Sequence, residues 1–218
     1  MPDLKLYILN TACTRVTLTA LEQVGVPYAA HMVDFATGEN RSAEYLALNP
    51  QGKVPCLLVD GQPLTENVAI LRWLNATYPQ AGLLPPATTP WDEAEQLIPM
   101  LSIASTWHPS VRAIKVPFMW TKGGDPAPVK ARGEEIYRGL LDGLDAHLAA
   151  RRWWFGDAWS IVDTYFWWAY VNAEFGGFDL SPWHNVVRHR AEVEALPQVQ
   201  RALAREAAEL QAMEARRE

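Results

Sequence analysis

A proline-rich segment divides this chain into two parts. Residues 78–90 hold four prolines and one glycine, a composition that excludes a regular helix or strand. Before the segment, short apolar runs alternate with helical patterns. After Trp91, apolar residues recur at the helical i, i+3, i+4 spacing without a convincing strand. We therefore predict a sheet-containing domain over residues 1–79, a linker over 80–90 and a helical domain over 91–218.

The first part has the element order of a small α/β domain. A strand, a helix closed by Gly25 and a second strand are followed by a hairpin that turns at Asp60 and Gly61, and by another helix with Thr65 as its N-cap. This order predicts a mixed four-stranded sheet. The expected strands are 5–9, 28–33, 54–59 and 62–64, and the expected helices are 14–24 and 66–77.

The second part is expected to be all-helical. Pro99 and Pro109 should bend or break its first helix, and the Ser160-Ile-Val-Asp163 box marks a helix start. Charges alternate over residues 205–218, which predicts a solvated helical end. The expected helices are 91–115, 128–150, 161–174 and 198–216.

Charge and cysteine content narrow the class of protein. The net charge of −6 argues against a nucleic-acid partner. No run approaches the roughly 18 apolar residues of a membrane span, so no membrane partner is expected. Two cysteines are too few for a disulfide framework and suit the reducing cytoplasm.

Tryptophan is unusually abundant. The chain has 10 Trp, and five of them lie within residues 153–168. Two interpretations stay open: a bulky helical core, or an aromatic-lined pocket for an apolar ligand.

Pro55 opens a strand that otherwise has the pattern of a buried one, where proline is normally excluded. A cis Val54–Pro55 bond would resolve the conflict by turning the chain and leaving the N–H and C=O of Val54 unpaired. Such a backbone suits a peptide-like ligand held in an extended pose. An edge-strand proline without a role is the alternative.

Glu66 and Asn67 fall at the first turn of the following helix. Free N–H groups and the positive dipole end there favour an anionic ligand group. The carboxylate of Glu66 would pair with an ammonium group, so the two positions suit an amino-acid head group. Simple compensation of the helix dipole is the alternative.

Cys13 lies between the first strand and the first helix, flanked by Thr11 and Thr14. A thiol at a helix N-terminus tends to be reactive, and the two hydroxyls would face the same ligand. No second cysteine is spaced to form a dithiol with Cys13, which disfavours a dithiol oxidoreductase. A small buried cysteine without chemistry is the alternative.

Together these motifs resemble the soluble glutathione transferases, and the bacterial beta and zeta classes most closely. The resemblance covers essentially the whole chain. It implies a thioredoxin-like domain with a mixed four-stranded sheet joined to an all-α domain, a cytoplasmic homodimer that serves detoxification, glutathione as co-substrate and no metal. It is carried by residues 5–7, 20–28, 49–55, 64–67, the proline-rich segment, Ser160 with Asp163, and 196–202.

The resemblance assigns the contacts with glutathione. Val54, before the proline Pro55 that is cis in the family, would pair its backbone with the cysteinyl part, and Glu66 would meet the γ-glutamyl amine. Asn67 stands where the family usually has Ser, so the contact with the γ-glutamyl carboxylate rests more on its backbone N–H. Lys53 would also approach the tripeptide.

The resemblance leaves the group that activates the thiol open. Cys13 coincides with the beta-class cysteine and Thr11 with the zeta-class serine, and Thr14 offers a further hydroxyl. Tyr7 is the candidate for the mammalian-type tyrosine. His108 is similar to a beta-class histidine that lines the cleft. The candidate walls of the electrophile pocket, on the helical side, are Trp107, Phe118, Trp120 and Trp168.

The function expected from the resemblance is addition of glutathione to an apolar electrophile, with a hydroxyl and the first helix's N-terminus stabilising the thiolate. One alternative is thiol exchange or deglutathionylation through Cys13. A second is a non-catalytic binding module of the same fold. The departure at Asn67, and Leu101 in place of a beta-class asparagine, favour that second alternative.

Overall fold

The computed structural model describes residues 1–217, and they form two compact units. The sheet unit comprises Met1–Leu83 and the C-terminal segment from Leu196 onward, and the helical unit comprises Leu84–Ala195. The sequence prediction grouped residues by chain order, whereas the contacts place the last helix with the sheet. Within the described residues, no helix is long and apolar enough to cross a membrane.

The sheet unit holds a four-stranded mixed sheet in the order β2-β1-β3-β4. Strand β1 pairs in parallel with β2 and antiparallel with β3, and β3 pairs antiparallel with β4. The parallel pair is joined by a crossover helix, as the strand–helix–strand pattern requires. The elements are β1 (Leu4–Ile8), α1 (Thr14–Val24), β2 (Ala29–Met32), η1 (Glu39–Arg41), α2 (Ala43–Leu48), β3 (Cys56–Val59), β4 (Gln62–Thr65), α3 (Asn67–Thr77), η2 (Pro79–Ala81) and α9 (Pro197–Ala215).

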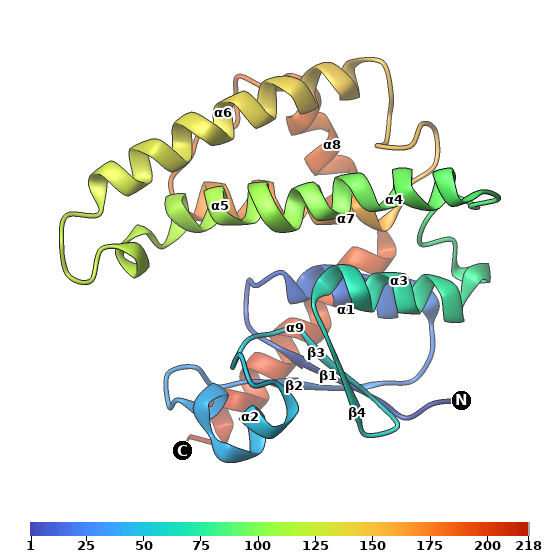
Figure 1. The fold of residues 1–218 in the computed structure, drawn as a ribbon, viewed down its shortest axis with the longest axis vertical. Coiled ribbons are helices and arrows are strands. Elements are labelled where there is room, and N and C mark those ends of the chain that lie inside the picture. The colour runs from blue at the N-terminus through green and yellow to red at the C-terminus, as the bar shows by residue number, and fades with distance from the viewer. Residues whose placement is uncertain (218) are drawn as a thin grey trace. The chain divides into compact units, whose positions relative to one another are not determined.

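Helices cover both faces of this sheet. Figure 1 shows α1 and α3 together on one side and α2 on the other. Helix α1 has the predicted bounds, because its apolar residues face inward and Gly25 ends it in the left-handed conformation at φ 73°. Helix α9 packs against α1 and β2. Its buried face includes Val199, Ala202 and Met213, which recur at helical spacing.

The start of α3 differs from the prediction by one residue. Thr65, the predicted N-cap, is the last residue of β4 and pairs with Cys56. The cap is instead Glu66, a non-glycine residue at φ 68°. The strand therefore runs one residue further than its apolar pattern indicated.

The helical unit is built around one almost entirely buried helix, α7. Every residue of α7 from Ile161 to Ala173 is buried, which is the pattern of a helix enclosed on all sides. Trp107, Trp153, Trp167 and Trp168 are also buried, so for these tryptophans the core interpretation is confirmed. The elements are α4 (Pro90–Ser102), η3 (Ile103–Trp107), α5 (His108–Lys115), η4 (Pro117–Trp120), α6 (Ala127–Ala149), α7 (Ile161–Phe175) and α8 (His184–Glu194).

The first predicted helix of this unit, 91–115, is divided into α4 and α5. Pro99 lies inside α4, and Pro109 lies in the first turn of α5. Between α4 and α5 the chain forms a π-helix over Ile103–Trp107. The wider π-helical turn makes room for the ring of Pro109. It also tolerates the hydrogen bond that is missing because Pro109 has no backbone N–H.

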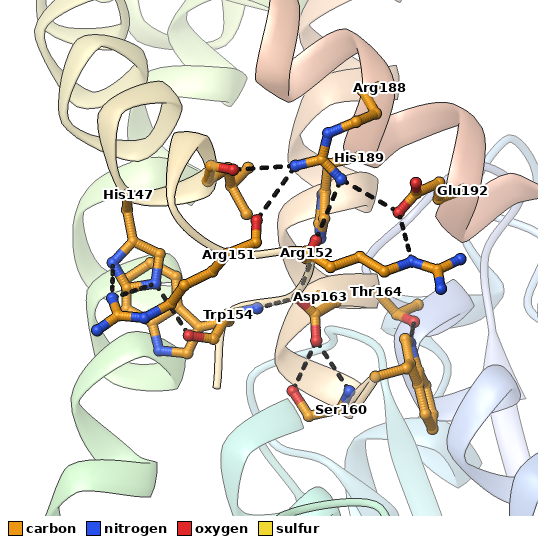
Figure 2. Close-up of polar contacts among 12 residues, drawn as sticks. His147, Arg151, Arg152, Trp154, Ser160, Asp163, Thr164, Arg188, His189 and Glu192 are labelled. Carbon is orange, nitrogen blue, oxygen red and sulfur yellow. Dashed lines mark hydrogen bonds and ion pairs between the residues drawn. The ribbon is translucent and has the colours of Figure 1, made fainter. Parts of the chain in front are cut away.

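Asp163 organises the start of α7, as the capping box predicts. Its carboxylate accepts from the N–H and the hydroxyl of Ser160, both at 2.8 Å, and from the N–H of Trp154 at 2.7 Å. His189 Nε2 lies 3.0 Å from Asp163 Oδ1. Figure 2 shows Asp163 at the centre of these contacts. Asp163 and His189 are both fully buried.

Helix α8 was not predicted, because the side chain that caps it comes from a distant part of the chain. Asp145 of α6 accepts from the N–H groups of Asn185 and Val186 at the start of α8. In return, Arg188 of α8 donates to the carbonyls of Leu148 and Arg151 at the end of α6, at 3.0 and 3.2 Å (Figure 2). Each helix therefore stabilises a terminus of the other.

Candidate functional site

Three connecting segments meet at one end of the sheet. Tyr7, near the end of β1, pairs with Cys56 at the start of β3, and Cys56 pairs with Thr65 at the end of β4. The same end of the sheet therefore carries three segments: the one after β1, the one before β3 and the one after β4. These segments carry residues 11–14, 53–55 and 66–67, the positions predicted to bind a peptide-like ligand.

The segment before β3 has the predicted cis bond between Val54 and Pro55. Val54 lies outside the β1–β3 ladder, whose last pair is Tyr7 with Cys56. The side chain of Lys53 is exposed, and its carbonyl accepts from the Tyr45 hydroxyl at 2.6 Å and from Asn49 Nδ2 at 2.7 Å. The path of the chain into Val54 is therefore held by side chains.

Gly52 completes this loop. It lies at φ 63°, and a Cβ there would be 2.7 Å from the carbonyl oxygen of Asn40. Asn40 also donates from Nδ2 to the carbonyl of Gly52 at 3.0 Å. Only glycine fits both the left-handed backbone and this close approach.

The side chain of Asn67 joins the starts of α1 and α3. Its Nδ2 donates to the carbonyl of Cys13 at 2.9 Å, and its Oδ1 accepts from the Thr17 hydroxyl at 2.5 Å. Because this amide is buried and already bonded, the groups that α3 can offer a ligand are its first backbone N–H groups. The first bond inside the helix runs from the N–H of Ile70 to the carbonyl of Glu66.

Glu66 differs from Asn67 in exposure. Its side chain is exposed and does not cap its own helix. A carboxylate thus stands beside the first N–H groups of a helix, which have no acceptor within the helix. The two can bind the ammonium and the carboxylate of one amino-acid head group.

The three hydroxyl and thiol candidates near α1 differ in their surroundings. Thr14 is fully buried, and its hydroxyl donates to the carbonyl of Leu9 at 3.1 Å. Cys13 is the N-cap residue of α1 and is 8% exposed. Thr11 is half-buried and has a left-handed backbone at φ 60°. Thr14 is thus bonded into the fold, and Thr11 is the most accessible of the three.

Two further groups at this end of the sheet, Tyr7 and Cys56, are held by packing or burial. The ring of Tyr7 packs edge-on against Tyr45 and His31, with ring centroids 5.3 and 5.4 Å apart. Burial raises the pKa of the Cys56 thiol to about 11, so this thiol stays protonated at neutral pH and does not act as a nucleophile.

Glu206 is a residue of this region that the sequence analysis missed. The prediction of a solvated end over residues 205–218 is wrong at this position, because Glu206 is only 3% exposed. It accepts from the N–H of Thr11 at 3.0 Å and forms an ion pair with Arg15 at 2.6 Å. In the sequence it is one charge in an alternating run, so no local signal distinguishes it.

Comparisons with known proteins identify the family of the chain. Residues 12–77 match the family model of the glutathione S-transferase N-terminal domain. The chain is 32% identical to a glutathione S-transferase of Xanthomonas campestris over 82% of its length and 86% of the relative. The chain belongs to the glutathione S-transferase family. A maleylacetoacetate isomerase of Pseudomonas aeruginosa is 31% identical to this transferase, over 84% of its chain and 86% of the relative.

A solved structure gives the same result for the fold. A glutathione transferase homologue from Sulfitobacter, crystallised with bound glutathione, superimposes with a TM-score of 0.83 at 28% identity. The match covers 94% of this transferase and 98% of that chain. The expected fold class, a mixed four-stranded sheet with a mainly helical remainder, is confirmed.

The helical unit of the transferase holds the predicted pocket residues in different surroundings. Trp107 packs in the core against Tyr137 and Phe166, with centroids 5.4 and 5.2 Å apart. The buried Trp168 contacts the ring of His108 at 4.5 Å. Phe118 and Trp120 lie on η4 and are 63% and 55% exposed.

None of the four predicted wall residues lines the groove between α5 and α6. An open groove of about 430 Å³ lies between α5 and α6, and its lining includes Pro109, Ala113 and Ile136. Of the four predicted wall residues, Trp107 and Trp168 are buried, whereas Phe118 and Trp120 are exposed.

Proposed function

We propose that this transferase binds glutathione at the end of its sheet and activates the thiol for attack on an apolar electrophile. The observation that carries the proposal is the alignment of Tyr7, Cys56 and Thr65, which brings the segments of Thr11, Val54 and Glu66 to one edge. Val54 lies outside the β1–β3 ladder, and its backbone N–H and C=O are proposed to pair with the cysteinyl part of the tripeptide. Glu66 and the first N–H groups of α3 receive the γ-glutamyl ammonium and carboxylate.

In this proposal the Thr11 hydroxyl donates a hydrogen bond to the sulfur of glutathione. The thiol has a pKa near ~8.5, by analogy with free cysteine, so at pH 7 only a few per cent is thiolate. Each unit by which the pKa falls corresponds to ~1.4 kcal/mol of preferential stabilisation of the anion. The hydroxyl and the N-terminus of α1 both favour the anion.

The chemical step is a nucleophilic substitution or addition at carbon. The thiolate, whose proton has passed to solvent, forms a carbon–sulfur bond with the electrophile. In a substitution the bond to a leaving group such as chloride breaks and the leaving group departs with its electron pair. In an addition the π bond of the electrophile breaks, and the carbanion that results takes a proton from solvent. Holding the two reactants together supplies much of the remaining rate enhancement.

Replacing Glu66 with glutamine tests the binding site. We expect isothermal titration calorimetry to show glutathione binding by the wild-type protein and a Kd about tenfold higher for Glu66→Gln, because one ion-paired hydrogen bond is lost. Glu44→Gln is the matched control, since Glu44 is also an exposed acid in the first turn of a helix. Equal Kd values for wild type and Glu66→Gln would exclude Glu66 from the ammonium site, and absence of binding by the wild type would refute the proposed function.

The proposed enzyme is a cytoplasmic homodimer. Trp91, Ile98 and Leu101 are 72%, 63% and 52% exposed and share one face of α4. Such an apolar stripe favours contact with a second copy of the chain. Both cysteines are free thiols, which favours a reducing compartment.

Light scattering in solution tests the dimer. We expect a mass twice the 24.4 kDa of the chain, and the mass of a single chain for the double variant Ile98→Glu, Leu101→Glu, because two buried charges would oppose association. A monomeric wild-type protein, or a double variant that still dimerises, would contradict this assignment of the face.

A further inference from the structure

Thr11 has a backbone conformation that its residue type disfavours. Its φ of 60° lies in the left-handed region, where a β-branched residue is a genuine outlier. Such strain persists only where the surrounding structure holds it in place, and it is often found at functional sites. The question is therefore which contacts hold Thr11.

The turn before α1 is held from two directions. On one side, the carbonyl of Leu9 accepts from the N–H of Ala12 and from the Thr14 hydroxyl, both at 3.1 Å. On the other side, the N–H of Thr11 donates to Glu206 Oε1 at 3.0 Å, across 195 residues of sequence. Glu206 is thus a long-range contact to the strained residue itself.

Glu206 is in turn held by Arg15. Arg15 Nε donates to Oε2 at 2.9 Å and to Oε1 at 3.1 Å, and Nη2 donates to Oε2 at 2.6 Å. The side chains of Arg15 and Glu206 are 11% and 4% exposed. A guanidinium that engages both oxygens fixes the carboxylate in one orientation, so Oε1 is presented to Thr11 at a defined place.

Packing alone does not account for a carboxylate here. The other buried residues of α9 are uncharged: the apolar Val199, Ala202 and Met213, and Gln198. An apolar residue at this position would avoid the cost of removing two charges from water. A carboxylate can accept the hydrogen bond from the N–H of Thr11, and an apolar side chain cannot.

We propose that Glu206 is a positioning residue, which holds the Thr11 backbone in the conformation from which its hydroxyl reaches the sulfur of glutathione. The inference rests on the proposed function, because it concerns the same site. Through Glu206, the last helix α9 takes part in activating the thiol of glutathione. The charged groups that it couples are Arg15 on α1 and Glu206 on α9.

A double-mutant cycle between Thr11→Val and Glu206→Ala tests this role. In the wild-type background, Glu206→Ala is expected to lower kcat for conjugation about tenfold, with the KM for glutathione changed less than about threefold. In the Thr11→Val background, where no hydroxyl is left to position, the same substitution is expected to change kcat less than about twofold. Glu214→Ala, at an exposed position of α9, is the matched control.

The isosteric variant Glu206→Gln covers the case in which Glu206→Ala does not fold. In glutamine an amide nitrogen replaces Oε2, so the contacts of that oxygen with Arg15 are lost. The remaining oxygen still accepts from the N–H of Thr11 and from Arg15 Nε. We therefore expect kcat within about threefold of the wild type and an unchanged pH profile of kcat. A tenfold loss in folded Glu206→Gln, or an equal loss of kcat from Glu206→Ala in both backgrounds, would overturn the positioning role. A wild-type protein that neither binds nor uses glutathione would instead refute the proposed function.

Discussion

Replacing Asp163 with alanine is expected to lower the free energy of unfolding by about 3–5 kcal/mol, because the substitution leaves buried donors without an acceptor. The N–H groups of Ser160 and Trp154 lose their acceptor, and so does His189. The start of α7 thereby loses the N3 carboxylate of its capping box, and α7 is the enclosed helix of its unit. Urea denaturation followed by tryptophan fluorescence measures the loss, because nine of the ten tryptophans lie in the helical unit.

Asp92→Ala is the matched control for this prediction. Asp92 forms the same kind of capping box at the start of α4, where it accepts from the N–H groups of Thr88 and Thr89 at 2.8 and 2.9 Å. Its contacts are exposed, so water replaces the carboxylate and the loss should be much smaller. If Asp163→Ala lost no more stability than Asp92→Ala, the buried network would not have the structural role assigned to it.

The largest effect on activity is expected for Thr11→Val. The two side chains have the same shape and the same β-branching, so the backbone at φ 60° is equally strained in both. Only the hydroxyl is lost. We expect kcat for conjugation to fall about 100-fold, as for the loss of one donor to a reacting anion, and the KM for glutathione to change less than about threefold.

Two further substitutions make this result specific. Thr11→Ser keeps the hydroxyl and should retain kcat within about threefold. Cys13→Ala separates conjugation from thiol exchange: we expect conjugation to continue, because the proposal assigns no nucleophilic role to this thiol. Full activity of Thr11→Val, or loss of conjugation in Cys13→Ala, would transfer the activating role from Thr11 to another group.

Elements with local signals were predicted well from the sequence. Helix α1 has the predicted bounds, because Gly25 and the apolar spacing before it are both local. The capping box at Ser160 and Asp163 marked the start of α7 for the same reason. The cis bond at Pro55 followed from a proline where a buried strand should begin.

What sequence reasoning missed depends on distant partners. Helix α8 is capped by Asp145, about 40 residues before it in the chain, and its own residues have little apolar periodicity. Glu206 gains its position from Arg15 and Thr11, at the other end of the chain. The burial of Trp107 depends on Tyr137 and Phe166 around it. These contacts join residues that are far apart in the sequence, so no local sequence pattern indicates them.

A crystal structure of the protein with glutathione bound tests the central claim most directly. The account predicts that the γ-glutamyl group lies at Glu66 and the start of α3, that the cysteinyl backbone pairs with Val54, and that Thr11 Oγ1 lies within about 3.5 Å of the sulfur. A sulfur that contacts Cys13 Sγ instead, or a tripeptide bound away from this end of the sheet, would contradict it.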